Sequence, residues 1–175
     1  MIDLDQHEDG TVVRAAPSTE GPSGFDFLHG RWEVLHTKLR ERLAGCRDWH
    51  CFPGTLDVAP ILGGMGNFDQ NGLADPAGAY EAHSLRLYSP SNRTWSVWWL
   101  DARDPGAGLG APVRGRFDGR KVWLYGDDTF GDRPIRVRTT YEPLDAGRAQ
   151  WTQAFQETDG GWEVNWIMDF TRVAA

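Results

Sequence analysis

The sequence has only two cysteines and no long apolar segment. Cys46 and Cys51 lie close together with His50 between them. A structural zinc site needs four ligands, usually as two pairs, and no second pair exists in the chain. We therefore predict two reduced thiols and no metal site. No segment approaches the ~18 consecutive apolar residues of a membrane-spanning helix, so we predict no membrane partner.

Positive charge is also scarce. The 175 residues include 18 Lys and Arg against 25 Asp and Glu, which gives a formal net charge of −7. Nucleic acids are held by clustered positive charge, so we predict no nucleic-acid partner. The first ten residues, MIDLDQHEDG, are acidic and lack the basic and then apolar layout of a secretory signal. This favours a cytoplasmic location.

Tryptophan, in contrast, is abundant, with nine copies. The segment GGWEVNWIMDFTR, residues 160–172, alternates apolar and mostly polar residues. Alternation of this kind is typical of a strand with one buried and one solvated face. By this period Trp162, Trp166 and Met168 share the inner face. The segment predicts a C-terminal strand that brings aromatic surface into the interior.

Turn sequences such as SPSN, DGR, DAGR and DGG divide most of the chain into short strands. The first strand is expected from Arg31 to about Leu43, although Leu35, Leu39 and Leu43 also fit the spacing of a helix. The segment WHCFPGTLDVAPIL predicts one or two strands interrupted at Pro53-Gly54. GGMGNFDQNGLADPAG is interpreted as a glycine-rich connection. Consecutive antiparallel strands of this kind predict a sandwich or an up-and-down barrel.

The N-terminal segment differs in composition from the rest. Residues 1–23 are rich in Asp, Glu, Gly, Pro and Ser and show no apolar period. We predict a flexible arm there, followed by a single β-barrel domain over residues 24–175. The sequence FDFLHG predicts a short helical turn that closes one end of the fold.

Two short motifs at opposite ends of this region carry a resemblance. Gly30-Arg31-Trp32 opens the first expected strand, and Arg172 ends the last one in DFTR. The pair resembles lipocalins and their calycin relatives, where Gly-x-Trp opens the first strand and an Arg near the C-terminus covers the Trp. The resemblance implies that Gly30 and Trp32 form the motif and that Arg172 stacks on Trp32. A guanidinium on an indole face gains a cation–π contact.

Longer segments resemble a narrower group. FDFLHGRWEV, GGMGNFDQN, WWLDAR and WEVNWIMDFTR are similar to uncharacterised bacterial lipocalin-like proteins of unknown function, over most of residues 25–173. The resemblance implies an all-β fold, an antiparallel up-and-down β-barrel of about 8–10 strands with a short N-terminal helical turn. It assigns no chemistry.

The strand period predicts which side chains face the barrel interior. If Trp32 points inward, so do Val34, His36, Lys38 and Arg40. In IRVRTTY the apolar face is expected inside and Arg136 and Arg138 outside. In TWSVWWLD both faces carry tryptophan, so the inner face stays open. The candidate ligand-binding residues are His36, Lys38, Trp49, His83, Trp99, Trp151, Trp166 and Met168.

Three functions fit this barrel. The first is binding of a small apolar or aromatic ligand without chemistry, in a cavity lined by aromatic side chains. The second is an isomerase or cyclase that transfers protons, with His36, His83 or Asp101 as weak catalytic candidates. The third is a filled barrel acting in protein association, as a homodimer through Trp98 or Trp123.

Cofactor motifs are weak. GGMGN lacks the Lys-Ser/Thr of a phosphate-binding loop, and no Gly-x-Ser-x-Gly occurs. We predict no cofactor, with haem held by one histidine as a lesser alternative. Binding is expected ahead of catalysis.

Overall fold

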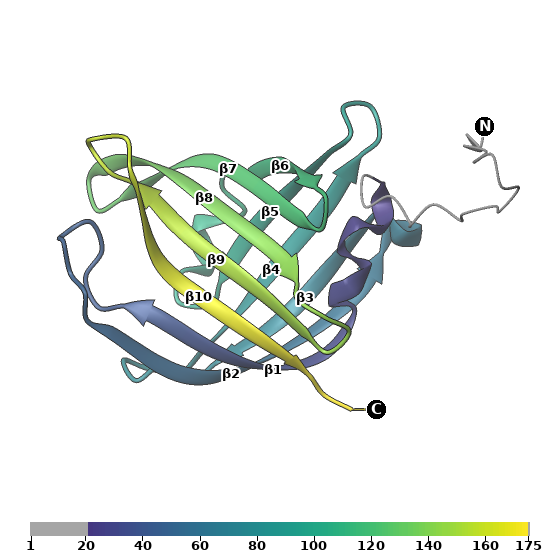
Figure 1. Cartoon of the computed structure of the whole chain (residues 1–175), viewed down its shortest axis with the longest axis horizontal. Helices are drawn as coiled ribbons and strands as arrows, with labels where there is room; N and C mark the ends of the chain where they lie inside the picture. Colours follow the sequence, from purple (N-terminus) through teal and green to yellow (C-terminus); the bar gives the residue numbers. More distant parts are fainter. Residues whose placement is uncertain (1–20, 175) are drawn as a thin grey trace, which may run out of the picture.

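Ten antiparallel strands form a closed barrel in the computed structural model, which describes residues 21–174 (Figure 1). Each strand pairs with the next along the chain, and β1 pairs with β10 to close the sheet. The strands are β1 (Gly30–Leu39), β2 (Trp49–Ile61), β3 (Gly66–Leu73), β4 (Tyr80–Ser89), β5 (Thr94–Asp101), β6 (Val113–Asp118), β7 (Lys121–Phe130), β8 (Arg133–Pro143), β9 (Arg148–Gln156) and β10 (Trp162–Arg172). The predicted all-β, up-and-down, lipocalin-like barrel is confirmed.

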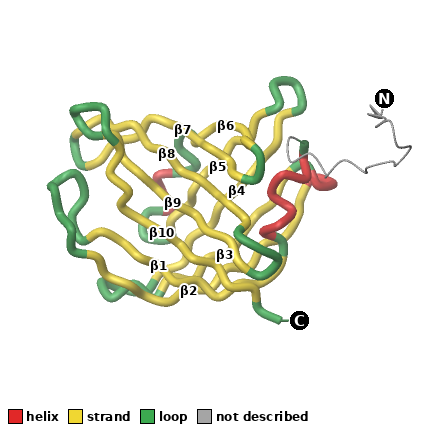
Figure 2. Tube along the Cα trace, in the orientation of Figure 1, coloured by secondary structure: helices red, strands yellow, loops and turns green. Residues whose placement is uncertain are grey.

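Among residues 21–174, helical structure is confined to short 3-10 turns, drawn red in Figure 2: η1 (Pro22–Leu28), η2 (Leu62–Gly64) and η3 (Pro105–Ala107). The first is the predicted turn at FDFLHG. Within residues 21–174, no helix is long and apolar enough to cross a membrane. The proposed arm, residues 1–23, lies mostly outside the described residues, and the division into arm and domain stays a prediction.

Three boundaries differ from the sequence-based expectation. The segment expected as strand or helix up to Leu43 is a strand that ends at Leu39, and Leu43 lies in the loop that follows with a positive φ of 57°. β2 runs unbroken through Pro53-Gly54. The expected glycine-rich connection contains β3, where the buried positions Asn67, Asp69 and Asn71 are polar and show no apolar alternation.

The inner face of β10 also differs. The pairing of β10 with β9 shifts register between Val164 and Trp166, so one extra residue, Asn165, enters the strand. A bulge of this kind reverses which side chains face inward. Trp166 and Met168 face the interior, whereas Trp162 packs outside against Tyr125. Placing Trp162 on the inner face was wrong for this reason.

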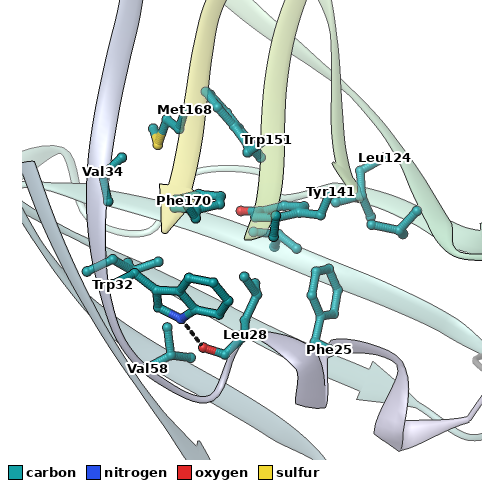
Figure 3. Packing of buried hydrophobic residues seen from close by; sticks show 14 of the residues in the cluster. Phe25, Leu28, Trp32, Val34, Val58, Leu124, Tyr141, Trp151, Met168 and Phe170 are labelled. Atoms are coloured by element: carbon teal, nitrogen blue, oxygen red, sulfur yellow. Dashed lines mark hydrogen bonds between the residues drawn. The ribbon is translucent and has the colours of Figure 1, made fainter. Parts of the chain in front are cut away.

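One end of the barrel is closed by a packed floor (Figure 3). Phe25 and Leu28 of η1 are fully buried there, and the Trp32 indole Nε1 donates to the Leu28 carbonyl at 2.7 Å. The guanidinium carbon of Arg172 lies 4.0 Å from the centroid of the Trp32 ring. Its two terminal nitrogens donate to the carbonyls of His29 and Phe27, both at 2.6 Å.

Gly30 permits this arrangement. Its φ is 103°, a conformation that L side chains rarely adopt, and a Cβ there would lie 3.2 Å from Nη1 of Arg172. The glycine of the Gly-x-Trp motif thus lets the chain turn from η1 into β1 beneath the guanidinium.

Candidate functional site

A cavity of about 710 Å³ occupies the barrel interior and opens at the end away from the floor. Its opening follows from strand pairing. β5 pairs with β6 over only three residues, Trp95 to Val97. Beyond Val97 the two strands part, and residues 102–112 cross the gap as a loop rich in glycine and proline. Residues 107–111 of that loop line the cavity.

The cavity wall is aromatic. Trp166 from β10 stands edge-on to Trp151 from β9 and to Trp99 from β5, with ring centroids 5.5 and 5.9 Å apart. Edge contacts of this type are favourable beyond the area that they bury. Met168 lines the same wall. Four of the eight predicted ligand-binding residues are therefore brought together, namely Trp99, Trp151, Trp166 and Met168.

His36 lies behind this wall and does not line the cavity. Its Nδ1 accepts a hydrogen bond from the Trp166 indole at 3.2 Å, and its ring stacks on Phe52 at 4.7 Å. Gly54 makes room for the ring, since a Cβ at that position would collide with His36 Nε2. Burial lowers the pKa of His36 to about 4, aided by the nearby charge of Lys38. The imidazole is thus neutral and holds Trp166 in place.

Lys38 supports the same tryptophan. Its Nζ lies 4.7 Å from the centroid of the Trp166 ring and pairs with Asp75 at 3.4 Å. Burial lowers the pKa of Lys38, with a further contribution from the charge of Arg42. Lys38 therefore touches the wall without lining the cavity.

Two predicted residues lie elsewhere. His83 is on the outer surface, stacked on Phe68 at 4.9 Å and bonded to Glu81 at 2.9 Å. Trp49 begins β2, and its side chain is not among those lining the cavity. The sequence left the inner face of β5 undecided, and the structure places Val97, Trp99 and Asp101 on it. Among residues 21–174, no histidine lines the cavity.

The deeper part of the cavity contains a buried polar cluster that sequence reasoning missed. Arg86 from β4 is 2% exposed and pairs with Asp69 from β3 at 2.6 Å. Its other terminal contacts are Asn67 at 2.9 Å and the Tyr141 hydroxyl at 3.2 Å. The neighbouring tyrosine and aspartate raise the pKa of Arg86 despite its burial. The pair is therefore charged but internally neutralised.

Two donor groups in this part have no hydrogen-bond partner within residues 21–174. They are Nε of Arg86 and Oγ1 of Thr139, a residue of β8 that is 6% exposed. Both residues line the cavity. A buried polar atom without a partner is costly, so such atoms in native structures call for an explanation.

Carboxylates dominate the mouth. Asp101 is held by Arg103, whose Nε and Nη2 donate at 2.9 and 2.6 Å. These hydrogen bonds lower the pKa of Asp101. Asp104 and Asp128 also line the opening and form no ion pair with another described residue. The mouth is therefore negatively charged.

The missed residues had a signal in the sequence. In NFDQN the polar residues Asn67, Asp69 and Asn71 alternate, which is the strand period with polar residues inside. The interpretation of GGMGNFDQNGLADPAG as a connection leaves no inner face at this position. The structure instead has a strand with a polar inner face on β3, and Arg86 of β4 lies opposite Asn67.

Comparisons with known proteins support the fold. No family model matches the chain, and no curated protein sequence matches it significantly. A solved S-type phycobiliprotein lyase from Guillardia theta superposes with a TM-score of 0.59 at 9% identity, over 87% of this chain and 92% of that one.

A second solved structure, of unknown function from the DUF3598 family of Nostoc punctiforme, has a TM-score of 0.52 at 13% identity. The match covers 85% of this chain but 48% of that protein, so the chain spans about half of its length. At these identities the likeness concerns the fold alone.

Proposed function

We propose that the barrel binds a small, largely apolar or aromatic ligand in its cavity and carries out no chemistry on it. The observation that supports this most is the contact between Trp99, Trp151 and Trp166 around an open volume of about 710 Å³. Ligand sites of roughly 300–1,000 Å³ are typically apolar walls with a few placed polar groups. The cavity has both.

An isomerase or cyclase is less well supported. Proton transfer needs a titratable group within hydrogen-bond reach of the substrate. Within residues 21–174 no histidine lines the cavity, and His36 Nδ1 is engaged by Trp166. Asp101 lines the mouth, but its oxygens are occupied by Arg103. His36 and His83 therefore lie outside the cavity lining, and Asp101 lies at the mouth paired with Arg103.

Association as a homodimer receives less support from the aromatic residues we had considered. Trp98 lines the cavity mouth. Trp123 on the outer face is half-buried, with Lys121 4.9 Å and Arg138 5.3 Å from its ring centroid. Neither forms an open apolar patch. A cytoplasmic location and the homodimer stay predictions.

The similar solved structure from Guillardia theta suggests one ligand class to include in tests. Its name describes a phycobiliprotein lyase. A linear tetrapyrrole therefore belongs in a ligand panel, beside haem, flavins, fatty acids and aromatic acids. Quenching of tryptophan fluorescence during titration is the first readout, because four tryptophans, Trp98, Trp99, Trp151 and Trp166, line the cavity.

The test compares an inner with an outer tryptophan. For any ligand that binds, we expect Trp166→Leu to weaken binding about fivefold by calorimetry, since an aromatic contact is worth about 1 kcal/mol. Trp123→Leu on the outer face is the matched control and should leave affinity unchanged. Saturable binding that ignores both substitutions would place the ligand outside the cavity. A panel without any binder would contradict the proposal.

A further inference from the structure

We infer that the cavity selects an aromatic ligand with a neutral hydrogen-bond acceptor at its inner end and a positive charge at its outer end. This inference rests on the proposed function of the same cavity and names the chemical class of its ligand. It follows from the two polar regions of the cavity, which differ in charge and in which atoms they leave free.

The inner end requires an acceptor. Nε of Arg86 can only donate, and it has no partner within the described chain. The Thr139 hydroxyl is likewise free and can donate to the same kind of group. A carbonyl oxygen that reached both would satisfy two buried donors at once.

The inner acceptor is expected to be neutral. Asp69 already compensates the charge of Arg86 at 2.6 Å, and its other oxygen accepts from Asn71 and from the Ser84 backbone. A ligand carboxylate there would bring a second negative charge beside Asp69 without an added cation. Like charges in a buried site oppose ionisation, so a ketone, amide or lactam fits better than an acid.

The outer end favours a cation. Among the cationic side chains near the mouth, Arg103 is paired with Asp101 and Lys38 with Asp75. Arg42 packs over Phe155 with its guanidinium carbon 5.6 Å from the ring centroid. The negative charge of Glu163 attracts the Arg42 guanidinium.

The carboxylates outnumber these cations. Asp104 and Asp128 line the mouth without an ion-pair partner in residues 21–174, and Asp127 stands opposite Arg136 in the strand register. The uncompensated charge at the opening is negative. A ligand amine there is attracted, and a carboxylate is repelled.

Naphthalenes of equal size test both ends. Three acetylnaphthalenes carry an aminomethyl, a methyl or a carboxylate group at the far end of the ring system. A fourth compound, an aminomethyl-ethylnaphthalene, keeps the amine and lacks the carbonyl. We expect the cation to bind about tenfold more tightly than the acid at low salt, near 20 mM, with the neutral compound between them. The difference should shrink at about 300 mM salt.

Variants separate the two ends. The double substitution Asp104→Asn and Asp128→Asn should remove most of the preference for the cation. Asp57→Asn with Asp118→Asn makes the same charge change at exposed sites that do not line the cavity, and it should leave the preference intact. Thr139→Val should weaken the acetyl compounds several-fold and spare the ethyl compound. Thr139→Ser keeps the hydroxyl and should keep the affinity.

The outcomes distinguish the inference from the proposed function. Binding of all four compounds with no order among them, or tighter binding of the acid, would overturn the inference and leave a general apolar site standing. An unchanged order of affinities in the double aspartate variant would show that Asp104 and Asp128 do not select the cation, and it would overturn the outer half of the inference. Failure of every compound, together with the wider panel, would overturn both.

Discussion

The floor and the cavity use the same residue types in opposite ways. At the floor, the indole nitrogen of Trp32 and both terminal nitrogens of Arg172 reach backbone carbonyls at 2.6–2.7 Å. In the cavity, Arg86 keeps its Nε and Thr139 its hydroxyl without a partner among residues 21–174. Arg172 has its terminal nitrogens matched by backbone carbonyls, whereas Arg86 is buried beside the cavity with one nitrogen unmatched.

This difference separates stability from binding. The polar atoms of Trp32 and Arg172 at the floor are matched by backbone carbonyls and gain nothing from a ligand, so these residues contribute to the free energy of unfolding. A region with unmatched atoms gives up part of that free energy, and a ligand restores it by forming the missing hydrogen bonds. Substitutions in the two regions should therefore change different measured quantities.

The largest expected effect concerns His36, which lies behind the tryptophan wall of the cavity. Its pKa is lowered from 6.5 to about 4, so the unfolded chain binds a proton at a higher pH than the folded one. Stability from this residue is complete above pH 6.5 and falls as the pH drops to 4, by about 3 kcal/mol. Urea unfolding of wild type and His36→Gln across this range measures it.

Glutamine does not titrate, so the free energy of unfolding of His36→Gln should fall by about 3 kcal/mol less than that of the wild type between pH 6.5 and 4. Other groups that titrate in both proteins cancel in the difference. Parallel curves would show that His36 is not buried in the neutral form.

The next effect tests the floor. Arg172→Ala removes the cation over Trp32 and two hydrogen bonds to carbonyls. We expect the free energy of unfolding to fall by about 2 kcal/mol, with ligand affinity unchanged. Arg172→Lys keeps the charge without the planar fork and should recover only part of the loss. A stable Arg172→Ala protein with weakened binding would break the division between the regions.

The smallest effect on stability is expected at Trp99, which is half-buried on the cavity wall. Trp99→Leu should cost about 1 kcal/mol or less in unfolding, because one face of the ring already meets open space. Its effect on ligand affinity should be larger, about fivefold or more. Paired unfolding and binding curves for this variant show whether the wall serves the ligand rather than the core.

Much of the fold could be predicted from sequence because a meander of hairpins is recognisable from local turn and strand patterns. Turn chemistry placed the strands, and the Gly30 and Trp32 pattern with Arg172 indicated which strands meet. What failed depended on distant partners. The bulge at Asn165 moved Trp162 outside, and nothing in the local alternation indicates an inserted residue. The site was half predicted, through its tryptophans.

The polar half of the site was missed for a physical reason. Asp69 and Arg86 are acceptable inside only because each neutralises the other, and that pairing exists only after β3 and β4 align. A residue-by-residue estimate of burial places both outside. Pairs of opposite charge on inner positions of adjacent strands are the pattern to search for.

The topology has a consequence for how the barrel forms. Nine of its ten strand pairings join neighbours in the chain, and one, β1 with β10, joins residues more than a hundred positions apart. Local hairpins close quickly, whereas a distant pairing must overcome the entropy of the whole intervening loop. We therefore expect this pairing of β1 with β10, the seam of the barrel, to be the slow step of folding. Contacts that form only after the seam closes should then set the rate at which the barrel unfolds. Trp32 under Arg172 lies on that seam, so the floor acts on the lifetime of the closed barrel.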